Sequence, residues 1–127
     1  MEITQVMFNN NEPIFMQIIE HIKTLAAAGY LKGGDKIPSI RELSKSLQVN
    51  PNTVGRAFQE MERQGITVTQ RGLGVFIVND ESRLEQLKEE LAQSHSETYL
   101  DNMIRLGFTK EEIFSKLEVY YAQCIGS

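Results

Sequence analysis

Apolar and polar positions along the chain repeat with two different periods. Apolar residues recur every three or four positions in five stretches, which predicts five helices, at about residues 13–28, 40–48, 51–64, 82–106 and 110–124. Residues 66–69 alternate as a half-buried strand does, and residues 75–78 form a second short apolar strand. The glycine-rich segment 70–74 between them predicts a turn. The pattern predicts a mostly α-helical protein with a small β-hairpin.

The second and third predicted helices carry clear start signals. Ser39 and Glu42 have the spacing of a capping box, in which each residue bonds the backbone N–H of the other. Asn50 is a suitable N-cap for the next helix, and Pro51 suits its first position because the missing N–H would be unpaired there. We expect an apolar face on each helix, with Ile40, Leu43 and Leu47 on the first and Val54, Ala57, Phe58 and Met61 on the second.

Two helices joined by about three residues form a helix-turn-helix, whose second helix enters the DNA major groove. A hairpin directly after this motif makes it a winged helix, with Arg71 in the turn of the wing. The order of these elements is more specific than any one of them.

Several motifs in this order resemble the DNA-binding domain of GntR-family bacterial transcription regulators. They are PIFMQ at 13–17, GDKIPSIREL at 34–43, VNPNTV at 49–54, RA at 56–57 and RGLGVF at 71–76. The resemblance covers about residues 12–78, and the short helical remainder resembles the YtrA subfamily, which implies a target operon that often encodes an ABC transporter. The sequence departs from the family at Gly55, where relatives usually carry a polar residue, and at Gly33, where they often carry proline.

Eight residues are the candidates for DNA contact. Arg56 is the candidate for reading bases, since arginine binds guanine O6 and N7 through two hydrogen bonds, and a phosphate contact is its alternative. Arg41 is expected at a phosphate or a base, and Arg71 at the minor groove or the backbone. Ser39 is first a helix cap. The full set is Ser39, Arg41, Asn52, Thr53, Arg56, Arg71, Gly72 and Gly74.

The polar connector at 79–82 divides the chain into a DNA-binding domain, residues 1–78, and a helical module, residues 79–127. Two helices cannot bury their apolar faces alone. They could pack on the winged helix, on each other or on a second copy, and we expect the last two together, in a homodimer. The candidate dimerisation residues are Leu84, Leu87, Leu91, Met103, Ile113, Leu117 and Tyr120. The nearby aromatic residues have two interpretations, dimer core or the lining of a pocket for an unidentified small-molecule effector.

Composition narrows the function further. The chain has a net charge of −4, yet residues 1–78 hold eight Lys and Arg against seven Asp and Glu, and the acid is concentrated in the remainder. No apolar run approaches the ~20 residues of a membrane helix, no signal peptide is evident, and the single Cys124 excludes an internal disulfide framework, so we expect a cytoplasmic protein. No catalytic or metal-binding motif occurs, and His21 is expected to be structural.

The sequence thus favours a dimeric transcription repressor that binds an inverted-repeat operator and needs no cofactor. The alternative is a winged helix that serves only protein contacts. Arg41, Arg56 and Arg71 argue against this alternative, because they lie on the three elements that contact DNA in winged helices.

Overall fold

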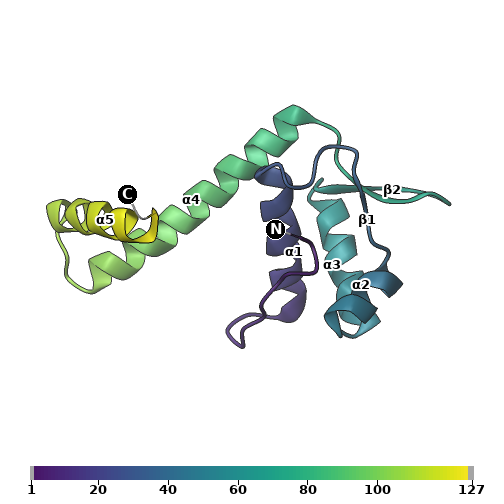
Figure 1. Ribbon diagram of the computed structural model, residues 1–127, viewed down its shortest axis with the longest axis horizontal. Helices are drawn as coiled ribbons and strands as arrows, with labels where there is room; N and C mark the ends of the chain where they lie inside the picture. The colour runs from purple at the N-terminus through teal and green to yellow at the C-terminus, as the bar shows by residue number, and fades with distance from the viewer. Residues whose placement is uncertain (1, 126–127) are drawn as a thin grey trace. The chain divides into compact units, whose positions relative to one another are not determined.

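The computed structural model describes residues 2–125 and contains five helices and three short strands among them (Figure 1). In chain order the elements are α1 (Ile14–Ala27), β1 (Lys36–Ile37), α2 (Ile40–Leu47), α3 (Pro51–Arg63), β2 (Thr67–Gln70), β3 (Gly74–Ile77), α4 (Glu81–Arg105) and α5 (Lys110–Ile125). The predicted class, mostly helical with a small β-structure in a winged helix, is confirmed.

The sheet has one strand more than the sequence indicated. Its order is β1-β3-β2 with antiparallel neighbours, so β3 lies in the middle. In this register Phe76 pairs with Lys36 on one side and with Val68 on the other. The predicted two-stranded hairpin was incomplete because β1 has only two residues, too few to display an alternating pattern.

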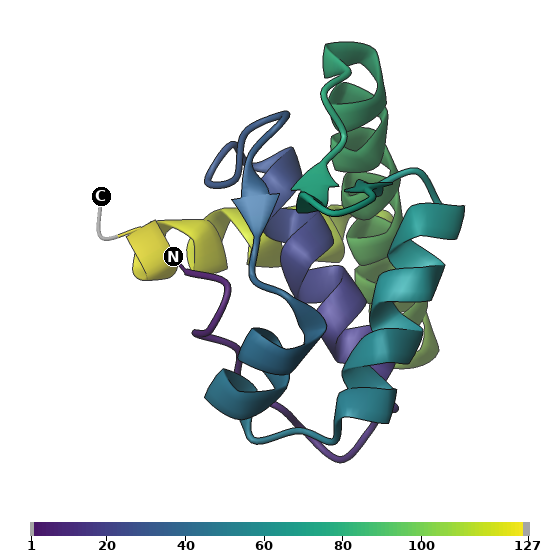
Figure 2. The same ribbon diagram turned by 90° about the vertical axis from the view of Figure 1, so that its right-hand side faces the viewer.

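Residues up to Glu89 form one compact unit, which we call the head. Its helices α1 and α3 lie side by side (Figure 2), and α2 also packs on α3. The largest fully buried side chains come from all of its elements and include Ile18, Ile22, Leu25, Ile37, Leu43, Val54, Met61, Ile66, Thr67, Ile77 and Leu87.

Three apolar side chains differ from their predicted surroundings. Ile40 was expected on the buried face of its helix with Leu43 and Leu47, but it is 38% exposed while Leu43 is fully buried. Leu87 was expected at a dimer interface, but it is 0% exposed in the core of the head, and Leu84 packs against the same core. The periodicity of α4 indicated that Leu84 and Leu87 would be packed against an apolar surface. It did not show that this surface belongs to the head.

The second compact unit begins at Glu90 and holds the rest of α4 and all of α5. Among its described residues, Ile113 alone is buried. Helix α5 begins at the predicted capping box, in which Thr109 and Glu112 each bond the backbone N–H of the other. Many of its large apolar side chains are exposed, namely Leu100, Ile104, Leu106, Phe114, Leu117, Val119, Tyr120, Tyr121 and Ile125. Within residues 2–125, no helix is both long enough and apolar enough to cross a membrane.

Candidate nucleic-acid interface

The first helix of the helix-turn-helix is fixed at its start by the predicted capping box. The Glu42 N–H donates to Ser39 Oγ over 3.1 Å, and the Ser39 N–H donates to Glu42 Oε1 over 3.0 Å. The hydrogen bond from the Ser39 backbone lowers the pKa of the Glu42 carboxyl below its usual value. This capping box fixes the N-terminus of α2. Arg41, in the first turn of α2, is exposed.

The turn into α3 is equally defined. Gln48 adopts a left-handed conformation with φ of 56°, and the Val49 N–H bonds the Ser44 carbonyl over 3.0 Å. Asn50 Oδ1 then accepts the Asn52 N–H over 2.8 Å, as expected for an N-cap. The first turn of α3 consequently presents Asn52 to solvent and leaves Thr53 half-buried.

Arg56 is exposed, but its guanidinium group is not free. Its Cζ atom lies 3.9 Å from the centroid of the Phe15 ring, which comes from the first turn of α1. A cation over an aromatic face at this distance is attracted by the ring quadrupole. Phe15 therefore orients the candidate base-reading residue, a role that sequence spacing gave no means of finding.

The wing is a tight turn that extends from β2 to β3. The Leu73 N–H bonds the Gln70 carbonyl over 2.9 Å, and Arg71 is exposed in the turn. Gly72 has a φ of +79° with open space where a side chain would be, so glycine serves the backbone conformation there. Gly74 has a second constraint, because a Cβ atom would come within 2.7 Å of Lys36 Cε.

Two adjacent hollows bring most of the predicted residues together. Ser39, Arg41, Gly72 and Gly74 line the first, between α2 and the wing. Asn52 and Arg56 line the second, on the exposed side of α3. Ile40 borders both hollows. Neither Thr53 nor Arg71 belongs to the lining of these two hollows.

The second hollow also contains residues that the sequence analysis did not select. Gln59 follows Gly55 by one helical turn and lines the same hollow, and it is exposed. Its spacing from Asn52 and Arg56 was a usable signal, since residues three or four apart share a helix face. Glu62 also lines this hollow, and its Oε1 accepts the Thr69 N–H over 3.1 Å, which ties α3 to the wing.

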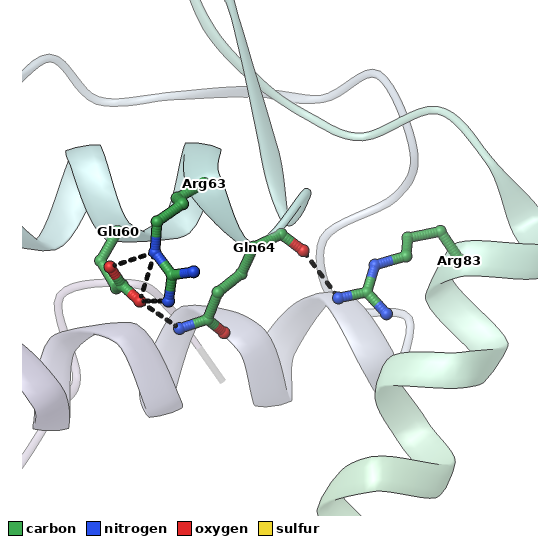
Figure 3. A network of polar contacts seen from close by, with 4 residues as sticks. All are labelled: Glu60, Arg63, Gln64 and Arg83. Atoms are coloured by element: carbon green, nitrogen blue, oxygen red, sulfur yellow. Dashed lines mark hydrogen bonds and ion pairs between the residues drawn. The ribbon is translucent and has the colours of Figure 1, made fainter.

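The far end of α3 is held by a polar network (Figure 3). Arg63 Nε donates to Glu60 Oε2 over 2.9 Å, and the Gln64 amide donates to Glu60 Oε1 over 3.1 Å. These contacts, chiefly the hydrogen bond from Arg63, lower the pKa of Glu60 to about 2. Arg83 of α4 donates to the Gln64 carbonyl over 2.7 Å, so the start of α4 is bonded to the end of α3.

The candidate dimerisation residues do not share one environment. Leu84 and Leu87 belong to the head, as described above. In the second unit Leu91 and Met103 are half-buried, Ile113 is buried, and Leu117 and Tyr120 are 40% and 46% exposed.

Other candidate chemistry is sparse in the part of the chain that the structure describes. No cluster of His, Cys, Asp or Glu there could hold a metal ion. His21 Nε2 lies 3.0 Å from the carbonyl oxygen of Glu2, a contact within the head. Cys124 is a free, exposed thiol near the end of α5.

Relatives of known sequence match most of the chain. The chain is 38% identical over 113 residues to YhcF of Bacillus subtilis, described as an HTH-type transcriptional regulator, covering 89% of this chain and 93% of the relative. It is 41% identical over 95 residues to YtrA of the same organism, described as an HTH-type transcriptional repressor, covering 70% of this chain and 73% of the relative.

Solved structures give the same result. A GntR family transcriptional regulator from Listeria monocytogenes superposes with a TM-score of 0.82 at 38% identity, covering 87% of this chain and 97% of that one. The DNA-binding domain of AraR in complex with an operator superposes with a TM-score of 0.54 at 25% identity, covering 58% of this chain and 95% of that one.

The family described as bacterial regulatory proteins, gntR family, matches residues 15–77, which span α1 to the end of β3. DNA binding is thereby favoured over the alternative of a winged helix restricted to protein contacts, and the relatives are regulators rather than enzymes. The chain belongs to the GntR family of DNA-binding transcription regulators.

Proposed function

We propose that the chain is a homodimeric repressor that binds an inverted-repeat operator, with one head on each half-site. The observation that carries the proposal is the continuous surface of the two hollows, which share Ile40, Phe58 and Val75. It combines α2, the exposed side of α3 and the wing. A winged helix contacts DNA through its recognition helix and neighbouring backbone-binding groups.

Each candidate residue has a defined role in this proposal. Asn52, Thr53 and Arg56 face the bases or phosphates of the major groove. Arg41 and Ser39 bind phosphates near the start of α2, where backbone N–H groups also favour an anion. Arg71 contacts the minor groove, and Gly72 and Gly74 allow the backbone of the wing to approach it closely.

The proposal assigns dimerisation to the helical module within residues 79–127, but to fewer residues than the sequence analysis selected. Since Leu84 and Leu87 pack in the head, the remaining candidates are Leu91, Met103, Ile113, Leu117 and Tyr120. The exposed apolar side chains of α5 support this assignment, because a second copy would remove them from water. Two-fold symmetry suits two half-sites of an inverted repeat.

The repressor role is supported by the similarity to YtrA, which is described as a repressor. In this mechanism the bound dimer blocks a promoter in the cytoplasm. A small molecule bound among the aromatic residues of the second unit would release it by changing the spacing of the two heads.

The first test is the molar mass in solution, alone and with a duplex from the gene's own upstream region. We expect about twice the chain mass of 14.5 kDa, one duplex per dimer, and an affinity that falls steeply between about 50 and 200 mM salt as counterions are released. A monomer that leaves the duplex free at low salt would contradict the proposal.

A further inference from the structure

The apolar side chain of Ile40 lies between the polar side chains that are the candidates for DNA contact. It is 38% exposed at the first position of α2. Its neighbours around the two hollows include Arg41, Asn52 and Arg56. An isolated exposed isoleucine is unremarkable on an ordinary surface, but this one borders both hollows of the DNA-binding face.

The adjacent residue on α3 is Gly55, whose missing side chain is not required by the fold. A Cβ atom built there would meet only Ile40 Cδ1, at 3.9 Å, which is an ordinary van der Waals contact. Its φ is not in the left-handed region. Glycine inside a helix is less favourable than almost every other residue. Neither packing nor backbone conformation therefore requires glycine at this position. The missing side chain leaves an open space beside Ile40.

The open space lies in a hollow that is lined by both apolar and polar residues. Ile40, Pro51 and the bare backbone of Gly55 line the same hollow, with the polar side chains of Asn52 and Gln59 also lining it. Pro51 contributes no N–H group. We call the space bounded by Ile40, Pro51 and Gly55 the apolar recess.

The apolar recess adjoins the start of the helix that enters the major groove. On the major-groove edges of the four base pairs, the only apolar group is the 5-methyl group of thymine. We propose that the apolar recess binds a thymine methyl group, so that Ile40 and Gly55 select thymine at one position of each half-site. This inference rests on the proposed use of α2 and α3 in DNA binding.

The test removes the methyl group and nothing else. Duplexes that bind the full-length chain are first selected from a random synthetic pool. The selected duplex is then resynthesised with deoxyuridine in place of each thymine in turn, and affinities are measured by fluorescence anisotropy. Synthetic DNA carries no methylated cytosine, so thymine is the only source of the group.

For the wild-type chain we expect one thymine per half-site whose replacement weakens binding about four-fold, the value of burying one methylene-sized group. Ile40→Ala should bring this ratio close to one by removing a wall of the recess. Gly55→Leu should do the same by filling it, with an unchanged or higher melting temperature because leucine is the better helix former. Met16→Ala, an exposed apolar change on α1, should keep the wild-type ratio.

The possible outcomes separate this inference from the proposed function. If the wild-type chain binds the selected duplex but no uracil replacement weakens it, the recess does not bind thymine and the DNA-binding role stands. The same conclusion follows if Ile40→Ala and Gly55→Leu keep the wild-type ratio. Failure to select any duplex at low salt would instead contradict the use of this surface for DNA.

Discussion

At the scale of single residues, the position of Arg56 depends on a side chain distant from it in the sequence. The Phe15 ring lies under its guanidinium group, and Glu60 on the same helix adds a nearby negative charge. An arginine oriented before DNA arrives loses less conformational freedom on binding. This orientation suits a residue that reads a base more than one that meets a phosphate through a mobile side chain.

The first prediction compares two exposed cations. Arg56→Ala should weaken binding to the specific operator by about 1–3 kcal/mol and relax the preference at one base pair, because it removes a two-bond contact to guanine. Lys45→Ala should weaken binding to specific and unrelated duplexes by a similar small factor. Affinities for single-base operator variants provide the measurement, and identical profiles for the two variants would remove the base-reading role of Arg56.

The second prediction concerns Glu60 and acid. Its pKa is lowered to about 2 in the folded protein, chiefly by the hydrogen bond from Arg63, against an ordinary value of 4.5. The folded state therefore binds fewer protons than the unfolded state between these values. The stabilising contribution is complete above about pH 4.5 and is lost as the pH falls toward 2.

Melting temperatures between pH 5 and pH 2.5 test this linkage. Glu60→Gln should reduce the fall in melting temperature with acid. Arg63→Ala should have the same effect in the wild-type background and little further effect in Glu60→Gln, because both changes remove one interaction. Additive effects of the two substitutions would show that the carboxylate and the guanidinium group act separately.

At the scale of elements, the sequence predicted those features that depend on residues close together in the chain, namely helix caps, helix bounds and the wing turn. The capping boxes at Ser39–Glu42 and Thr109–Glu112 and the Asn50 cap are each set by residues within one helical turn. The helix bounds accordingly agree to within one or two residues. The wing turn was predictable for the same reason, since Gly72 adopts the positive φ that favours glycine.

Contacts between elements were less predictable. The strand β1 was missed because its two residues acquire strand character only by pairing with β3. Ile40 was predicted to be in the core because eight residues make only about two helical turns. So short a pattern does not show which apolar positions lie at the exposed margin of the buried face. The stack of Phe15 on Arg56 depends on the packing of α1 against α3, which no single segment encodes.

The third prediction concerns the junction between the head and α4. Leu87 is fully buried in the core of the head, so Leu87→Ala should lower the free energy of unfolding of the head by about 2–5 kcal/mol. Leu73→Ala, on the exposed wing, should change it little. Denaturant unfolding of both variants provides the comparison, and equal midpoints would show that α4 is dispensable for the head.

At the scale of the whole molecule, the proposed use of two heads matters because a single head carries little excess positive charge. Residues 1–78 hold one more cation than anions, and Arg63 is already bonded to Glu60. Phosphate neutralisation by a single head is therefore modest. Joining two heads makes the second contact intramolecular and raises the overall affinity without new contacts.

The fourth prediction tests this joining. Leu117 is 40% exposed on α5, and Leu117→Glu should convert the dimer to a monomer because it places a charge in an apolar interface. Binding to the inverted repeat should then fall to the level of an isolated half-site, while the far-ultraviolet circular dichroism spectrum stays unchanged. Glu118→Gln, at the neighbouring exposed position, should remain dimeric. A Leu117→Glu variant that stays dimeric would place the interface elsewhere.

The continuity of α4 constrains how chains of this kind can change in length over evolution. The helix runs unbroken from Glu81 to Arg105, with its first turns anchored in the head by Arg83 and Leu87. Within α4, one residue inserted after Glu89 would turn the helix positions that follow it by about 100° about the helix axis, whereas seven residues would nearly restore their original phase. Insertions and deletions in this segment are therefore expected to survive chiefly in multiples that preserve helical phase, so that natural variation in its length would itself record the geometry of the proposed dimer.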